Sequence, residues 1–291
     1  MDSSNITQTI IDTINSIFST LFSSIDNSIY SILDKLVFVD SDVVSNGFMS
    51  SFLNGSSNRS LIIIANSLLF AFAIYYCIKL LYSHFVSTDI ERPYQFIFKI
   101  LVVGIFVNCS YFLVDFFIDI NFNLSSAINR IGEFAFNKSI NFSSLISNLN
   151  SIVTIEGSTF NIFSLDGIVK GFISFGLLSL IFSYTLRYVM IKVFVLITPF
   201  AISSLVIKST SWFFRTWIKS IFSLLIIQSF VSLILLIIFS IDYSDDIFSK
   251  FMYIGGIYAL SKANSYVREL IGGISTDLQL GISSLRGIIN K

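Results

Sequence analysis

The sequence has few charged residues. Only 12% of its 291 residues are Asp, Glu, Lys or Arg, while 54% are hydrophobic and the mean hydropathy is +0.81. This balance lies outside the usual range of soluble domains, so the composition indicates an integral membrane protein. The 18 basic and 18 acidic residues cancel, and net charge alone therefore predicts no nucleic-acid partner.

Groups that usually carry out catalysis or bind metals are also scarce. The chain has one histidine, His84, and two cysteines, Cys77 and Cys109. It contains no HExxH, GxSxG, P-loop or CxxC pattern and no metal-ligand spacing of acidic residues, His and Cys. We therefore expect no enzymatic activity, no metal and no cofactor. The predicted topology places the two cysteines at different depths, which disfavours a disulfide.

Residues 167–241 contain no acidic side chain and only one proline. Two membrane crossings within this segment would need a turn, yet no Gly, Pro, Asn or Asp occurs in 177–197. Lipid offers no partner for freed backbone amides, so the chain should stay helical there. The sequence therefore predicts one long helix over 168–197, broken at Thr198–Pro199. Its last apolar turns, VFVLI, would project from the bilayer and need a protein partner.

The predicted fold class is all-α: a polytopic membrane protein with about five transmembrane helices and amphipathic helices at both termini. Apolar residues recur at helical spacing in residues 1–39 and again in the tail. The predicted order is an extracytoplasmic helix with a linker, two transmembrane helices, an extracytoplasmic polar loop, a membrane core and a cytoplasmic tail. These parts occupy residues 1–59, 60–118, 119–166, 167–261 and 262–291. Besides the long helix, the predicted spans are Leu61–Ser83, Tyr94–Ile118, Thr216–Ile241 and Ile247–Leu260.

The positions of the basic residues predict an orientation. With five spans and the N-terminus outside, twelve of the eighteen Lys and Arg residues face the cytoplasm, in agreement with the positive-inside rule. Arg187 is one of the twelve and is predicted to lie at the cytoplasmic membrane surface. Six spans with both termini inside would keep the same bias, so charge leaves that alternative open. The absence of turn residues in 177–197 favours five spans, with the C-terminus in the cytoplasm.

Three amide side chains lie within predicted spans: Asn66, Asn108 and Gln228. Hydrogen bonding between helices is the role we expect for them. Lys99 and Asp115 lie near the two ends of the second span, from which they can reach the membrane surfaces. A proton relay or a substrate site would need such groups at mid-depth, and this argues against a secondary transporter.

The stretch KSTSWFFRTWIK interleaves basic and aromatic side chains: Lys208, Arg215 and Lys219 alternate with Trp212 and Trp217. This pattern is typical of an anchor at the cytoplasmic membrane surface, where aromatic and positive residues gather. A second interpretation is a contact site for an energising ATPase or for polyanionic cargo. So few charges do not by themselves establish nucleic-acid binding.

The order of these parts resembles the TrbL-type polytopic subunit of conjugative type IV secretion systems. The resemblance lies in an external amphipathic N-terminus, a polar loop, and the blocks LRYVMIKVFVLITPFAISSL and KSTSWFFRTWIKSIFSLLIIQ. It is strongest over residues 167–291. The hydrophobic blocks are punctuated by Arg187, Pro199, Trp217, Lys219 and Gln228 rather than by a catalytic signature.

The resemblance implies a channel or scaffold subunit embedded in the lipid bilayer of a bacterial cytoplasmic membrane. Such a subunit assembles in several copies with a secretion ATPase and other channel subunits, and helps to move DNA or protein out of the cell. The candidate contacts for a partner or cargo are Arg187, Lys192, Pro199, Lys208, Trp212, Arg215, Trp217 and Lys219. The alternative function is a small-molecule transporter or permease, and a membrane-embedded enzyme is disfavoured.

Overall fold

The computed structural model describes residues 9, 11–17, 20, 32–40, 42–45, 60–86, 90–153, 165–241 and 247–272. Most of the predicted N-terminal helix, and the predicted tail beyond residue 272, lie outside these residues. The elements are α2 (Asp42–Ser45), α4 (Leu61–Val86), α5 (Pro93–Asn108), α6 (Ser110–Phe136), α7 (Phe142–Val153), α8 (Leu165–Ser203), the 3-10 helix η1 (Ser204–Val206), α9 (Ser211–Phe239) and α10 (Ile247–Ile271). Every regular element in the described ranges is helical, which confirms the all-α prediction for that part.

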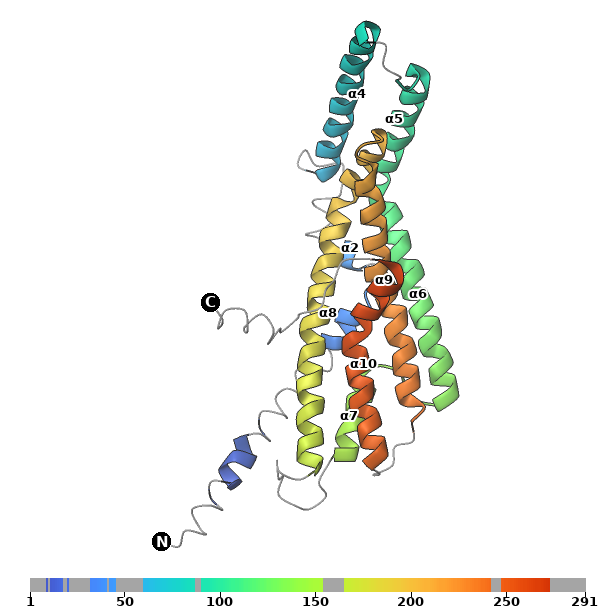
Figure 1. Cartoon of the computed structure of the whole chain (residues 1–291). Coiled ribbons are helices and arrows are strands. Elements are labelled where there is room, and N and C mark those ends of the chain that lie inside the picture. The colour runs from blue at the N-terminus through green and yellow to red at the C-terminus, as the bar shows by residue number, and fades with distance from the viewer. Residues whose placement is uncertain are drawn as a thin grey trace, which may run out of the picture.

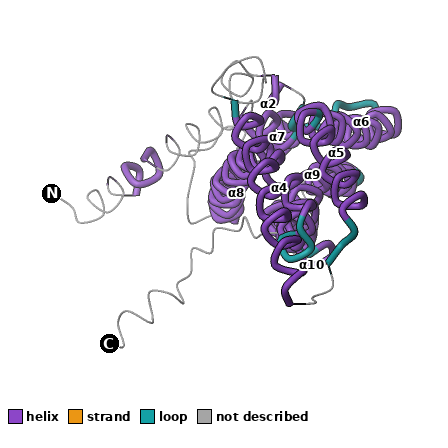
Figure 2. The backbone as a smooth tube through the Cα atoms, turned by 90° about the horizontal axis from the view of Figure 1, so that it is seen from above, coloured by secondary structure: helices purple, strands orange, loops and turns teal. Residues whose placement is uncertain are grey.

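The bundle is built around α9. α8 and α9 run antiparallel along most of the molecule, α10 packs on both, and α6 packs on α9 (Figure 1). Seen along the bundle, α9 lies between α8 and α6 (Figure 2). In its most apolar window, 61% of the α9 residues are buried, against 17% for α4. A helix that is apolar on all sides is stable only when it is covered, and here other helices of the same chain cover α9.

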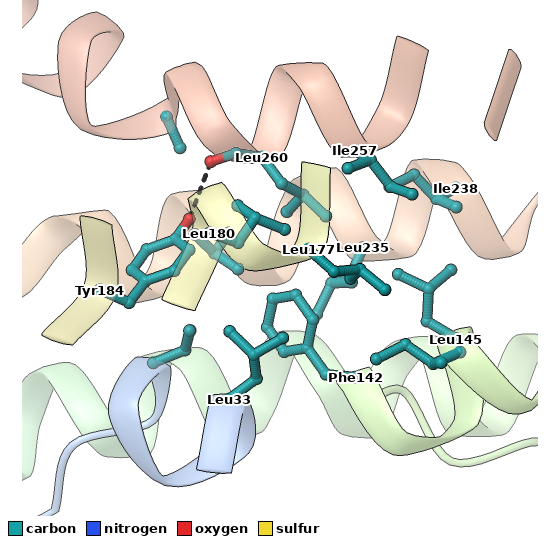
Figure 3. Close-up of a cluster of buried hydrophobic side chains, with 14 of the residues drawn as sticks. Leu33, Phe142, Leu145, Leu177, Leu180, Tyr184, Leu235, Ile238, Ile257 and Leu260 are labelled. Atoms are coloured by element: carbon teal, nitrogen blue, oxygen red, sulfur yellow. Dashed lines mark hydrogen bonds between the residues drawn. The ribbon is translucent and has the colours of Figure 1, made fainter. Parts of the chain in front are cut away.

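The largest buried cluster lies where residues 33–37 and α7 meet α8, α9 and α10 (Figure 3). Leu33, Phe142 and Leu235 come from three of these elements and fill its centre. At the edge of the cluster, the hydroxyl of Tyr184 donates to the carbonyl of Leu260 at 2.9 Å. This bond satisfies the hydroxyl, which is the only polar group of this fully buried side chain.

Two glycines allow the helices of this core to approach closely. A Cβ added at Gly176 of α8 would lie 2.6 Å from Cγ2 of Ile257 in α10. A Cβ added at Gly256 of α10 would lie 2.7 Å from Cγ1 of Ile238 in α9. Neither distance is possible for real atoms, so α10 can sit this near to α8 and α9 only because these positions have no side chain.

The prediction of a single helix across residues 177–197 is confirmed, because α8 covers the whole range. The predicted break at Thr198–Pro199 is wrong: α8 continues through Pro199 to Ser203 and then tightens into η1. A proline inside a helix removes one backbone bond and costs about 3 kcal/mol when exposed. Here Pro199 is buried, and Thr198 Oγ1 and Trp217 Nε1 both donate to the carbonyl of Phe194, each at 3.0 Å. The carbonyl that loses its backbone donor at Pro199 is that of Val195, so the bond from Trp217 joins α8 to α9 beside the proline but does not replace the lost bond.

The apolar turns before the proline, residues 193–197, pack largely against helices of the same chain. Phe194 is 8% exposed and Val195 is 1% exposed. They belong to a buried cluster that includes Ile118 of α6 together with Trp217 and Ile221 of α9. For Phe194 and Val195 the partner that the sequence required is thus supplied by the same chain, while Val193 stays 39% exposed.

The second predicted span is two helices rather than one. α5 and α6 meet at Cys109 with a bend of 60°. The predicted polar loop that follows is also largely helical, since α6 runs on to Phe136 and α7 begins at Phe142. Hydropathy falls beyond Ile118, but helical spacing continues with the buried Asn121 and Ser125, so the helix does not end where the apolar run ends.

Within the described residues, three helices are long and apolar enough to cross a membrane: α4, α8 together with η1, and α9. The bent pair α5–α6 makes a fourth if it is counted as one span. α10, which contains the fifth predicted span, is not among them. The structure therefore supports a membrane protein with three or four helices that are long and apolar enough to cross, while a fifth crossing stays a prediction.

Candidate functional site

Arg187 lies in the interior of the bundle. It is fully buried, whereas the sequence predicted a position at the cytoplasmic surface. Its Nε donates to the carbonyl of Leu224 in α9 at 2.7 Å, and its Nη1 donates to the carbonyls of Val37 at 2.9 Å and Leu36 at 3.4 Å. Its Nη2 has no hydrogen-bond partner among the described residues. Arg187 therefore joins α8 to α9 and to the N-terminal part of the chain.

Residues 33–39, which we call the buried segment, are held by side chains from three directions. The end of this segment is fixed by Gln228 of α9, whose Oε1 accepts from the amide of Val39 at 3.1 Å. Near its start, Oδ1 of Asp34 accepts from the amide of Phe142 at 2.8 Å. Oδ2 of the same carboxylate accepts from the amide of Ser143 at 3.3 Å and from its hydroxyl at 2.9 Å. Because these amides open α7, Asp34 acts as a remote helix cap.

The position of the buried segment corrects the predicted topology. The sequence placed residues 1–59 outside the cell and Arg187 at the opposite membrane surface. Because Arg187 donates directly to Val37, both placements cannot hold at once. Charge patterns assign each basic residue to a surface by default, and they do not show that carbonyl groups distant in sequence can accept its hydrogen bonds.

Gln228 also connects α9 to α6. Its Oε1 accepts from Nδ2 of Asn121 at 3.3 Å, and its Nε2 donates to the hydroxyl of Ser125 at 2.8 Å. The hydroxyl of Ser229 donates to Oδ1 of Asn121 at 3.2 Å and closes the network. Asn121 and Ser125 were not singled out from the sequence. Their spacing of four residues, in register with Val114 and Ile118, is the signal that places them on the buried face of α6.

Asn66 and Asn108 meet between α4 and α5. Nδ2 of Asn66 lies 3.2 Å from Oδ1 of Asn108, and Nδ2 of Asn108 lies 3.4 Å from Oδ1 of Asn66. Nδ2 of Asn108 also donates to the carbonyl of Gly104 at 2.8 Å. The pair ties the N-terminal end of α4 to the C-terminal end of α5, next to the cluster in which both helices pack on α8.

The basic and aromatic stretch 208–219 divides into exposed and buried members. Lys208, Trp212, Arg215 and Lys219 are exposed around the turn between α8 and α9. Trp217 is 4% exposed and its indole donates to α8, so it is part of the core rather than a contact for a partner.

The remaining candidate contacts differ in accessibility. Pro199 is buried within α8, so neither it nor Arg187 is available to another molecule in this structure. Lys192 is half-buried, with its Nζ 4.6 Å from the ring centre of Tyr188. A partner or cargo contact on this end of the chain is therefore limited to the exposed basic residues and Trp212.

No group of three or more His, Cys, Asp and Glu side chains is placed to hold a metal ion in the part of the chain that the structure describes. Comparisons with protein-family models, curated proteins and solved structures gave no match to this chain.

Proposed function

We propose that the protein is a non-enzymatic, membrane-embedded channel or scaffold subunit of a type IV secretion machine. It helps to move DNA or protein across a bacterial cytoplasmic membrane, together with a secretion ATPase and other channel subunits. The sequence resemblance suggests this class of machine. The structural observation that carries the proposal is the height of the exposed apolar surface.

Exposed apolar side chains extend over more than one bilayer. On α8, Phe172 is 65% exposed and lies 30 residues, or about 45 Å, from Ile202. Leu69 of α4 packs in the same cluster as Ile202, and the exposed face of α4 continues from there for 16 residues, or about 24 Å, to Phe85 (Figure 1). The apolar surface is thus about 70 Å high, roughly twice the ~30 Å hydrocarbon layer.

Tilting does not resolve this mismatch. A helix pair would need a tilt well beyond the 0–40° that membrane helices adopt to bring the whole surface into lipid. Exposed apolar surface outside the lipid is unfavourable by about 25 cal/mol per Å². Other protein must therefore cover one end of the surface, as a subunit of a larger assembly requires.

The interior of the bundle supports a scaffold more than a transporter. The polar groups at its centre, such as Arg187 and Gln228, are used for bonds between helices and to the buried segment. A transporter would present polar groups to a substrate cavity at mid-depth. A path for large cargo would then be formed between subunits rather than through one chain.

The test is photo-crosslinking combined with affinity purification in mild detergent. A photoreactive residue is placed at Phe98 of α5 or at Phe172 of α8, which are 70% and 65% exposed at opposite ends of the apolar surface. Only one of them can face lipid, so we expect protein adducts from the other, and co-purification of a secretion ATPase and further channel subunits. Recovery of a lone monomer, with adducts to lipid at both positions, would contradict the proposal.

A further inference from the structure

A polar pocket of about 360 Å³ lies at the end of the molecule where α4, α5 and the α8–α9 turn meet. Its walls include Tyr75, Tyr76 and Lys79 from α4, and Lys208 from the turn. Glu91, just before α5, completes the opening. The pocket therefore brings two lysines together that are 129 positions apart in the sequence.

The charge of this pocket favours an anion. Lys79 and Lys208 are exposed, and neither forms an ion pair with any described residue. The carboxylate of Glu91 is balanced by Lys99, whose Nζ lies 3.7 Å from its Oε2. Two positive charges thus remain at the opening.

The pocket is held in shape by its own walls. The rings of Tyr76 and Phe96 stack with centroids 3.8 Å apart and an angle of 6° between their planes. The hydroxyl of Tyr76 donates to the carbonyl of Glu91 at 2.5 Å. These contacts join α4 to α5 directly below the opening, so a ligand meets a preformed site.

The surface around the pocket indicates whether the anion belongs to a lipid or to a soluble compound. Ile74 and Ile78 are exposed beside Tyr75 and Lys79, on the face of α4 that other helices leave uncovered. A soluble phosphate compound has no apolar chain that could contact such a surface. A phospholipid fits both features, because its phosphate can bind the lysines while its acyl chains lie along the apolar face.

We propose that this pocket binds the phosphate headgroup of an anionic phospholipid, with Lys79 and Lys208 as its ligands. Basic pockets between transmembrane helices are a recurring way in which membrane proteins recognise such lipids. The site does not depend on the secretion function, but it requires that α4 faces lipid, which is the crosslinking outcome in which Phe98 lies in lipid and Phe172 is covered by protein. It would fix the α4–α5 hairpin against the α8–α9 turn at the membrane surface.

The test is native mass spectrometry of the full chain in detergent, titrated with phosphatidylglycerol. The double variant K79Q/K208Q should bind this lipid ~30-fold more weakly than the wild type, because each lysine near an anionic membrane contributes about fivefold. The matched control R215Q/K219Q removes two charges from the same end but outside the pocket, and it should stay within about twofold of the wild type. Circular dichroism verifies that both variants keep their helix content.

Two further arms identify the ligand. Phosphatidylcholine, which has no net charge, should bind the wild type and K79Q/K208Q equally weakly. sn-Glycerol 3-phosphate, which has the phosphate but no acyl chains, should not displace bound phosphatidylglycerol. Equal losses in both double variants, no loss in K79Q/K208Q, or binding of sn-glycerol 3-phosphate as tight as that of the lipid would each overturn the proposal.

Discussion

Arg187 shows how much a single residue contributes to this bundle. A buried guanidinium without a carboxylate is costly, and this one is stabilised by three backbone carbonyl groups instead. Two of these groups belong to Leu36 and Val37, at the end of a helical stretch where carbonyls lack partners within the helix. The carbonyls therefore gain donors from Nε and Nη1 of the guanidinium, while Nη2 stays without a partner among the described residues.

Replacing Arg187 with Met tests this interdependence. We expect the free energy of unfolding to fall by about 2–4 kcal/mol, because the change leaves buried carbonyls without donors. The buried segment should also become accessible, so a cysteine at Val37 should react with a maleimide in Arg187→Met but not in the wild-type background. Both measurements use a chain from which Cys77 and Cys109 have been removed.

The matched control is Lys192→Met, five residues further along α8, where the basic side chain is half-buried and its Nζ lies 4.6 Å from the ring centre of Tyr188. It should leave both the unfolding temperature and the labelling of Val37→Cys unchanged. Equal stability of Arg187→Met and Lys192→Met would show that the guanidinium does not hold the segment.

The two tryptophans offer a second comparison at the scale of residues. Trp217→Phe removes the bond to Phe194 and should lower the unfolding free energy by about 1 kcal/mol, whereas Trp212→Phe, at a position 64% exposed, should have no effect. Fluorescence of each single-tryptophan variant provides an independent measurement. The variant that keeps Trp217 should shift to longer wavelength on unfolding more than the one that keeps Trp212. Equal stabilities would contradict the role assigned to the indole.

At the scale of elements, the position of α10 depends on glycines that face its neighbours. Gly255 and Gly256 are adjacent, but only Gly256 lies against Ile238, and a Cβ at Gly255 would meet no atom within 4 Å. Gly256→Ala should therefore lower stability by about 1–3 kcal/mol through overpacking. Gly255→Ala should be neutral or stabilising by up to about 1 kcal/mol, since alanine favours a helix. Thermal unfolding in detergent measures both, and a destabilised Gly255→Ala would refute this packing explanation.

The α4–α5 hairpin depends on a different kind of contact. Its helices are held near the bend by the amide pair of Asn66 and Asn108, whose side chains lie at the exposed edge of the contact between α4 and α5. A double-mutant cycle with Asn66→Leu and Asn108→Leu should give a coupling energy of about 0.6–1.7 kcal/mol, the range known for hydrogen bonds between membrane helices. A coupling energy of zero in unfolding titrations would show that the pair is not formed in the membrane.

At the scale of the whole molecule, basic residues from two separate connections gather at one end. Lys79 and Lys208 line one pocket, and Arg92 and Lys99 lie on the neighbouring start of α5. From the positive-inside rule we expect this end to face the cytoplasm. The opposite end then includes the last turn of α6 and the start of α10 (Figure 1).

Cysteine labelling in whole cells measures this orientation. In a chain without Cys77 and Cys109, a membrane-impermeant maleimide should modify Glu133→Cys, near the end of α6. It should reach Ser209→Cys, in the α8–α9 turn, only after the membrane is permeabilised. Both positions are exposed in the structure, so burial does not explain a difference between them. The reverse labelling pattern would invert the orientation.

The sequence by itself determined the class of the protein and the nature of its elements. Scarce charge and long apolar runs are properties of local composition, and they lead directly to helices that cross a membrane. The absence of turn residues over 177–197 was likewise sufficient to predict one uninterrupted helix there, as α8 shows. These features follow from short-range physics, because a backbone in lipid has few ways to satisfy its own hydrogen bonds.

Only the tertiary structure decided where the buried polar groups lie. Arg187 bonds to a carbonyl 150 residues away, and Gln228 to an amide 189 residues away. The helix also passes through the buried Pro199, in a region that packs against α6 and α9. No local sequence pattern shows these partners. From sequence alone, a basic residue is placed at a membrane surface and a proline is taken as the end of a helix. Only the folded chain shows which distant groups lie next to them.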